Sequence, residues 1–426
     1  MKITREQRDI LRGSKGENMA KVMKTVAIYG QTLGAERLVP ITPGYGHISL
    51  SCNMKSMEPV YDLVEKLIED GVTSAESFTV SPRPTDKAVP MSFSQKRYFK
   101  KRMFPRQEKW EAQLKQIGLS EKGGYTCTCY LDEVGNKPRK GDILAWSESS
   151  AVVYANSVLG ARCNRNAPMM DLMCSVIGAV PNFGLLTDEG RKASWVVKIR
   201  TTGQPDPQLL GAAVGLKVGG EVPYIIGMKK WLGTNLTEAV CGYLKDFGAA
   251  AASVSPMGMY HIAELTPEAG EQGSALVREN YKVYEIDDEE LERLRNSYPV
   301  LWKRRRAKAD LCIVGCPHMT LPQLINWTLK VERALQDVDR KKVYIPTVFT
   351  AAPDVISKFR ETEYAERLRV TGVILSHMCP LMYMSNPHSK SLRVITTSNK
   401  LRACTTARYY PEDEILSKIT KGGTVT

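Results

Sequence analysis

Two Cys-Pro steps, Cys316-Pro317 and Cys379-Pro380, each end a short apolar run and bring a thiol to the end of an expected strand. A third cysteine, Cys127, lies in the stretch YTCTCY. Three thiolates around an iron–sulfur cluster would leave one iron position open for a substrate hydroxyl, where the metal acts as a Lewis acid. Spacing alone does not separate this chemistry from ordinary core cysteines, which are commonly buried.

The short motifs of several other enzyme classes are missing from the sequence. It contains no GxxxxGK[ST], HExxH, GxSxG, GxGxxG or CxxC pattern. Their absence disfavours P-loop, zincin, serine-hydrolase and simple dinucleotide-binding enzymes. The stretch GYGHIS at residues 44–49 is too short and irregular to predict a dinucleotide site.

The last third of the chain predicts the elements that position the Cys-Pro steps. Expected strands at residues 309–318, 341–350 and 369–380 alternate with helical patterns, and another strand follows at 391–400. This alternation predicts a parallel sheet with right-handed crossovers. Thr320 with Gln323 forms a capping box, which leaves Cys316 and His318 in the loop before a helix. Because ligands bind at the carboxyl ends of parallel strands, these strand ends are expected to meet in one crevice.

Length and composition indicate an enzyme of several α/β subdomains. The chain has 426 residues, 43% hydrophobic and 25% charged, and a single core rarely grows to that size. We expect three parts, at residues 1–125, 126–305 and 306–426. A helix is expected at 237–247, followed by a small-residue strand containing AAAAS. The polar N-terminus, the lack of a long apolar stretch and the ten cysteines predict a cytoplasmic protein.

A formal net charge of +13 is concentrated in basic runs at residues 96–106 and 303–308. Such runs can be solvated surface, attract an anionic substrate or partner, or bind nucleic acid. No RNA-binding signature accompanies them, so nucleic acid is the least favoured partner. The Pro-rich basic stretch at 81–109 is expected to be a surface excursion that serves as a lid or contact surface.

A longer pattern places the chain in a family. The block AWSESSAVVYANSVLGARCNRN (145–166) closely resembles aconitase X, in its catalytic large-subunit region. The stretches GCPH (315–318), YTCTCYLDEVGNKPRKGDILAW (125–146) and HIAELTPEAG (261–270) are similar to the same family, as is TTSNK (396–400). The resemblance extends from about residue 3 to about residue 422.

This resemblance implies an aconitase-like α/β fold, with several parallel-sheet subdomains around a central cleft, and a hydro-lyase activity. It implies an iron–sulfur cluster of unspecified iron count on Cys127, Cys316 and Cys379, with His318 near the substrate or the cluster. It also implies a separate small subunit, a swivelling β-rich domain that carries the serine thought to abstract the proton. The expected substrate is mevalonate 5-phosphate or cis-3-hydroxy-L-proline, and the alternative is a catalytically altered protein with a scaffold or nucleic-acid-binding role.

Dehydration beside a carboxylate needs donors for that carboxylate and polar groups around the reacting carbon. Arg162, Asn164 and Arg165 are candidates for a carboxylate clamp. The complete set of candidate substrate-binding residues is His47, Glu148, Ser149, Ser150, Asn156, Ser157, Arg162, Asn164, Arg165, His261 and Glu268, and the catalytic candidates are His318, Ser398 and Lys400.

Each of these candidates also has an ordinary structural interpretation. Ser149 and Ser150 are typical of a helix N-cap, Arg162 of a surface ion pair, and His261 with Glu268 of a buried hydrogen-bonded pair. His47 suits the closing of a turn, and Ser398 with Lys400 suits a strand-end loop.

The chain departs from the family pattern in four places. Cys129 replaces a proline, ILSHMCP replaces Thr-Asp-Thr-Cys-Pro, and SVSPMGMYH replaces a Ser-Ser-Gly-rich segment. After Lys400, the stretch LRACTTARYY with Cys404 replaces a short Ala-His-Tyr run. These changes are expected near the site and bear on the choice of substrate.

Overall fold

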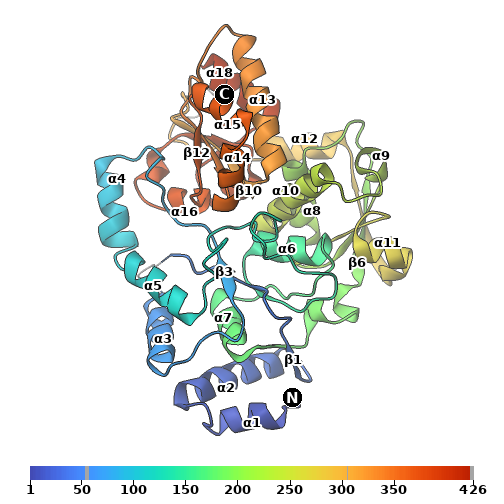
Figure 1. Cartoon of the computed structure of the whole chain (residues 1–426). Helices are drawn as coiled ribbons and strands as arrows, with labels where there is room; N and C mark the ends of the chain where they lie inside the picture. Colours follow the sequence, from blue (N-terminus) through green and yellow to red (C-terminus); the bar gives the residue numbers. More distant parts are fainter. Residues whose placement is uncertain (53–56, 305, 423–426) are drawn as a thin grey trace.

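Parallel β-sheets organise the protein, whose computed structural model describes residues 1–52, 57–304 and 306–422. Over these residues the chain forms three parallel sheets and one short antiparallel pair. Figure 1 shows the three parts that these sheets define, with the C-terminal part at the top and the N-terminus at the bottom. None of the helices in the described ranges is both long and apolar enough to cross a membrane.

The N-terminal part is built around a small parallel sheet. Its strand order is β3-β2-β4, and β1 pairs separately with β5. The strands are β1 (Leu38–Pro40), β2 (Gly46–Ile48), β3 (Phe78–Val80), β4 (Ala145–Trp146) and β5 (Ala179–Pro181). The helices are α1 (Arg5–Leu11), α2 (Glu17–Thr32), α3 (Glu58–Glu69), α4 (Phe93–Tyr98), α5 (Gln107–Ile117), α6 (Ser149–Ser157) and α7 (Pro168–Ile177).

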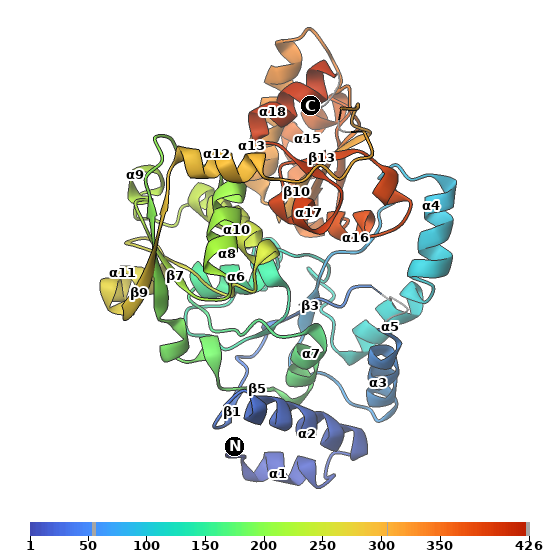
Figure 2. The same ribbon diagram turned by 180° about the vertical axis from the view of Figure 1, so that it is seen from behind.

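The middle part has a parallel sheet in the order β8-β7-β6-β9, which is seen edge-on in Figure 2 beside α8 and α10. Its strands are β6 (Ala193–Ile199), β7 (Pro223–Ile226), β8 (His261–Ile262) and β9 (Val277–Ile286). Its helices are α8 (Pro207–Val218), α9 (Lys229–Leu232), α10 (Glu238–Val254), α11 (Pro267–Gln272) and α12 (Asp288–Asn296).

The expected strand at AAAAS is wrong, because α10 continues through this run to Val254. Alanine has the highest helix propensity, and its small side chain lets two helices approach closely. A Cβ on Gly211 of α8 would lie 2.2 Å from the carbonyl oxygen of Phe247 in α10. The small residues therefore serve packing between α8 and α10 rather than packing of a helix on a strand.

The C-terminal part is a five-stranded parallel sheet in the order β12-β11-β10-β13-β14. Its strands are β10 (Leu311–Met319), β11 (Thr347–Ala351), β12 (Ile374–Ser376), β13 (Val394–Thr396) and β14 (Arg408–Tyr409). Its helices are α13 (Leu321–Gln336), α14 (Pro353–Arg360), α15 (Glu363–Val370), α16 (Pro380–Met384), α17 (Asn399–Cys404) and α18 (Glu412–Lys421). The predicted alternation and the Thr320–Gln323 capping box are confirmed. The expected loop position of Cys316 and His318 is wrong, because β10 continues through both residues to Met319.

Strand β10 is buried along its whole length, as expected for a central strand covered on both faces. Its pairing with β11 shifts between Val314 and Met319, so the Cys316 segment bulges out of the regular ladder. Gly315 has a φ of 104°, and a Cβ there would lie 2.4 Å from the Thr350 carbonyl oxygen. Only glycine fits this position directly before Cys316, which lines the cavity described below.

The basic excursion at 81–109 contacts the C-terminal part. It contains α4, the π-helix at Phe99–Met103 and the start of α5, and α4 lies beside the C-terminal part in Figure 1. The Tyr383 hydroxyl donates to the Pro90 carbonyl at 2.8 Å, and Gln95 donates to the Ser389 hydroxyl at 2.9 Å. The predicted division at residues 125 and 305 stays a prediction, and residue 305 lies outside the described residues.

Candidate active site

A cavity of about 440 Å³ lies where the carboxyl ends of two parallel sheets face each other. Ser49 follows β2, Ser81 follows β3, and Ser147 and Glu148 follow β4. From the opposite sheet come Cys316 of β10 and, in the segments after β12 and β13, Cys379 and Lys400. The geometry follows the general rule that ligands bind at the carboxyl edge of parallel strands, here from two sheets at once.

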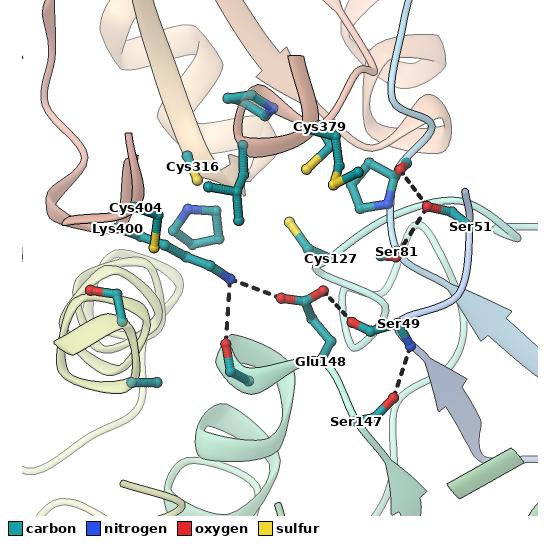
Figure 3. Close-up of a pocket in the computed structure, with 18 of the residues that line it drawn as sticks. Ser49, Ser51, Ser81, Cys127, Ser147, Glu148, Cys316, Cys379, Lys400 and Cys404 are labelled. Carbon is teal, nitrogen blue, oxygen red and sulfur yellow. Dashed lines mark hydrogen bonds and ion pairs between the residues drawn. The ribbon is translucent and has the colours of Figure 1, made fainter. Parts of the chain in front are cut away.

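The cysteines Cys127, Cys316 and Cys379 all line this cavity, although more than 250 residues separate the first from the last. In Figure 3 their sulfur atoms point into one shared space. Cys316 is buried, and the other two are half-buried. Burial raises the pKa of Cys127 to about 12, and it raises the pKa of Cys316 and of Cys379 as well. Without a bound cation these groups are therefore neutral thiols at pH 7.

His318 lies behind the cysteines and connects their loops. Its Nε2 donates to the Met378 carbonyl at 3.1 Å, and its Nδ1 accepts from the Thr126 hydroxyl at 3.2 Å. Its backbone N–H donates to the Cys127 sulfur at 3.3 Å. Burial lowers the pKa of the imidazole to about 4, so the ring is neutral. His318 does not line the cavity but bonds to the loops that carry Cys127 and Cys379, and its expected place near the substrate or the cluster stays a prediction.

Lys400 and Glu148 form an ion pair inside the cavity. Nζ of Lys400 lies 2.8 Å from Oε1 of Glu148 and donates a longer bond of 3.5 Å to the Ser149 hydroxyl. Burial alone would raise the pKa of Glu148, but the Lys400 ammonium lowers it to about 2. Burial opposes the charge on Lys400, yet Glu148 and the nearby cysteines raise its pKa above the ordinary value. Both groups are charged across the physiological range.

Serine hydroxyls complete the polar wall. Ser49 donates from its hydroxyl to Oε2 of Glu148 at 2.8 Å, and its backbone N–H donates to the Ser147 hydroxyl at 2.8 Å. The predicted residues Ser149 and Ser150 contact this group: Ser149 lines the cavity, and Ser150 donates to Glu148 at 3.5 Å. Glu148 itself is the N-cap of α6, and no side chain caps this helix. The N-cap interpretation of the two serines is therefore wrong.

Arg165 is the second cation of the cavity wall. Its Nη1 donates to the carbonyls of Ser255 at 2.7 Å and Met257 at 3.2 Å. Within the described ranges no carboxylate forms an ion pair with it, and its pKa is lowered by burial. Asn166, beside it on the wall, accepts from the Tyr29 hydroxyl and donates to Asp171.

Several predicted residues lie away from the cavity and form structural contacts. Arg191 donates to Glu268 at 2.7 Å and to Asn156 at 3.1 Å, and its carbonyl accepts from His261 at 2.8 Å. His261 and Glu268 are thus linked through Arg191 rather than paired directly. The other residues away from the cavity wall are Ser157, bonded to the Tyr260 N–H; Arg162, paired with Asp188; and Asn164, bonded to Phe183 and Leu185.

His47 and Ser398 lie just behind the cavity wall. The His47 ring contacts the Thr79 hydroxyl at 2.8 Å and packs edge-on against Trp146, and burial lowers its pKa to about 4. The Ser398 hydroxyl donates to the Cys316 carbonyl and caps α17 by accepting from the Leu401 N–H. Ser398 therefore anchors the Cys316 segment and begins the helix that presents Lys400.

Sequence reasoning missed the wall residues Ser49, Ser81, Ser147 and Ser253. A usable signal existed for Ser81, because FTVSP ends a strand with Ser-Pro in the way that Cys-Pro ends the runs at Cys316 and Cys379. Ser49 follows the short strand β2 within GYGHIS, a stretch in which His47 was the predicted site residue.

Three of the four departures from the family pattern reach the cavity. Cys404 and Ser253 line it directly, and the segment after β12 carries Cys379. Asp86 of the excursion accepts from Ser376 at 2.8 Å and lies 3.3 Å from His377, which holds this altered segment in place. Cys129 is fully buried in the core behind the cavity.

Comparison with known proteins identifies the class and then the family. The crystal structure of Thermococcus kodakaraensis aconitase X (holo-form) superposes with a TM-score of 0.79 at 26% identity, covering 98% of this chain and 100% of that one. Phosphomevalonate dehydratase large subunit from Thermococcus kodakarensis is 30% identical over 386 residues, or 89% of each chain. Cis-3-hydroxy-L-proline dehydratase from Pseudomonas aeruginosa is 29% identical over 61% of this chain and 43% of its own length. The chain is a hydro-lyase with a mixed α/β fold.

The family assignment comes from two domain models. The aconitase X first domain matches residues 1–189, and the aconitase X second domain matches residues 193–296. The chain belongs to the aconitase X family, which confirms the family expected from the sequence blocks.

Proposed function

We propose that this chain is the cysteine-bearing subunit of a dehydratase that removes water from a small anionic hydroxy acid. The observation that carries the proposal is the meeting of Cys127, Cys316 and Cys379 with the Lys400–Glu148 pair in one cavity. Thiols for a metal group, fixed cations for an anionic substrate and hydroxyl donors are all present within it.

The donor set fits an iron–sulfur cluster. Among the described residues no three His, Cys, Asp or Glu side chains gather closely enough to hold a single metal ion, whereas a cluster accepts ligands that are further apart. Cys127, Cys316 and Cys379 would hold it, and metal binding deprotonates such thiols. The Lys400 charge favours the anionic form of Cys127 and Cys316 by lowering their pKa against the effect of burial. When bound, the group supplies a Lewis acid for the departing hydroxide.

Mevalonate 5-phosphate is the proposed substrate. A phosphomevalonate dehydratase large subunit matches this chain over 89% of its length, and a second one, from Aeropyrum pernix, matches 94%. Arg165 and Lys400 supply cationic donors for its anionic groups. Cis-3-hydroxy-L-proline is the second candidate, because two dehydratases of that name also match, one of them at 32% identity over 47% of this chain.

A small subunit completes the proposed enzyme and supplies the base. Glu148, with a pKa of about 2, is a weak proton acceptor, and Lys400 is held in its charged form. Both side chains suit charge stabilisation and orientation better than proton transfer. The relatives named large subunits support a partner chain, and the family resemblance gives that partner a serine as the base. All ten cysteines are free thiols, which favours a reducing cytoplasmic setting.

Anaerobic reconstitution tests the proposal. We expect the wild-type chain to bind iron and sulfide with visible absorbance, and to dehydrate mevalonate 5-phosphate when its small subunit is added. Cys127→Ala, Cys316→Ala and Cys379→Ala should each lose most of the iron. Cys312→Ala is the matched control, because this cysteine lies fully buried in the same strand as Cys316 but outside the cavity. A colourless wild type, or equal iron in all four variants, would contradict the proposal.

A further inference from the structure

A further thiol stands in the cavity beside the three already described. Among the described residues five cysteines line it, namely Cys52, Cys127, Cys316, Cys379 and Cys404. Cys404 ends α17 and lies one helical turn after Lys400. Residues four apart share one helix face, and in Figure 3 Cys404 and Lys400 reach the cavity from the same side, next to Cys316.

The position of Cys404 is fixed while its sulfur is uncommitted. The Ser398 hydroxyl caps the start of α17, and just past its end the Thr405 hydroxyl donates to the Leu401 carbonyl at 2.6 Å. In the described part of the chain no hydrogen bond occupies the Cys404 thiol, which is exposed. Cys404 and Cys316 line the same cavity and lie next to each other in Figure 3.

Cys52, the fifth cysteine of the cavity wall, has both its sulfur and its side chain engaged by neighbours. Its sulfur shares a 3.3 Å hydrogen bond with the Ser51 hydroxyl, and its side chain packs with Phe99 and Phe104 in a separate apolar cluster. Cys404 is thus the better placed of the two to reach a metal group held by Cys127, Cys316 and Cys379.

We propose that Cys404 is a fourth sulfur ligand, bound when the cavity holds no substrate. This inference rests on the proposed iron–sulfur cluster. The thiol gives up its proton when it binds iron and takes one back when the substrate's hydroxyl group displaces it, so no oxidant or reductant is needed. The ligand closes the vacant iron position in the resting enzyme and protects it from solvent and oxygen until a hydroxy acid enters.

Alkylation of the full 426-residue chain with iodoacetamide, read by mass spectrometry, tests this assignment. In the apo chain the exposed Cys404 should react rapidly. After anaerobic reconstitution its rate should fall at least roughly tenfold, as expected for a thiolate bound to metal, and mevalonate 5-phosphate should restore it. Cys241 is half-exposed on α10 and lies outside the cavity, so it should react equally in both forms.

A spectroscopic comparison separates ligation from simple shielding. Cys404→Ser should shift the visible and electron paramagnetic resonance spectra of the reconstituted chain, and Cys52→Ser should not. If Cys404 reacts at its apo rate while Cys127, Cys316 and Cys379 are protected, the fourth-ligand assignment is overturned. The proposed cluster on the other three cysteines is then still supported. If no iron binds and no cysteine is protected, both proposals fail.

Discussion

Lys400 and Glu148 stand 252 residues apart in the chain and meet at 2.8 Å within the cavity. The side chains are 11% and 12% exposed, so the pair is largely withdrawn from water. Each charge is stabilised mainly by the other, because burial opposes both. The pair joins the strand-end segments of two separate sheets and gives the cavity its fixed charge.

Breaking this pair should cost stability. We expect Lys400→Met and Glu148→Gln each to lower the free energy of unfolding by about 3 kcal/mol, because each leaves a buried charge or donor without its partner. The double variant should lose less than the sum of the two, as measured by urea unfolding. Lys15→Met is the control, because Lys15 pairs with Glu6 at an exposed site and should change stability by less than about 1 kcal/mol. Strictly additive losses would show that the two residues do not interact.

His318 should act on the metal group through the cysteine loops. Its ring contacts Thr126 and Met378, the residues just before Cys127 and Cys379. We expect His318→Gln to retain iron roughly tenfold less well against a chelator, because the loops lose their common support. His261→Gln is the control, since His261 is equally buried but bonds to Arg191 away from the cavity. Equal iron retention in both variants would assign His318 to general packing.

Arg165 should bind an anionic group of the substrate. A hydrogen bond to a charged group contributes about 1.5–3 kcal/mol, so Arg165→Met should raise KM at least roughly tenfold with a smaller change in kcat. Arg162→Met is the matched control, because Arg162 pairs with Asp188 outside the cavity. Steady-state kinetics with mevalonate 5-phosphate and the small subunit measure both variants. Similar KM values for the two would place the anion site elsewhere.

Buried His261 should make stability depend on pH. Burial lowers its pKa to about 4 in the folded chain, whereas an unfolded histidine titrates near its ordinary value of about 6.5. Between these values the unfolded state binds more protons, so stability falls as pH decreases from about 6.5 to about 4. His261→Gln should reduce this slope by up to about 1.4 kcal/mol per pH unit in urea unfolding measured across that range. An unchanged slope would mean that His261 is already protonated in the folded state.

Local features of the C-terminal part could be predicted from the sequence. The capping box at Thr320 and Gln323, the strand–helix alternation and the position of Cys316 at a strand end follow from short-range patterns, and the structure has all three. The AAAAS run was misassigned because a row of small residues suits either element, and only its fit against the glycines of α8 selects the helix.

The resemblance to the family could not show which residues of a matching block face the cavity. Asn156, His261 and Glu268 lie in blocks that resemble the family, yet the structure uses all three around the buried Arg191. A matching block contains residues that line the cavity and residues that only support the structure around it, and the sequence does not distinguish the two. Arg191 itself carried no sequence signal.

Caps, periodicity and turn residues act over a few positions, so the amino-acid sequence is enough to predict which chemical groups the chain owns and which of them end strands. The shared cavity of Ser49, Glu148, Cys316 and Lys400 depends on long-range packing, since two sheets must face each other before these strand ends meet. The fold also sets the pKa of Glu148. A glutamate carboxyl group in water has its ordinary pKa, whereas that of Glu148 is about 2 because the fold places Lys400 beside it.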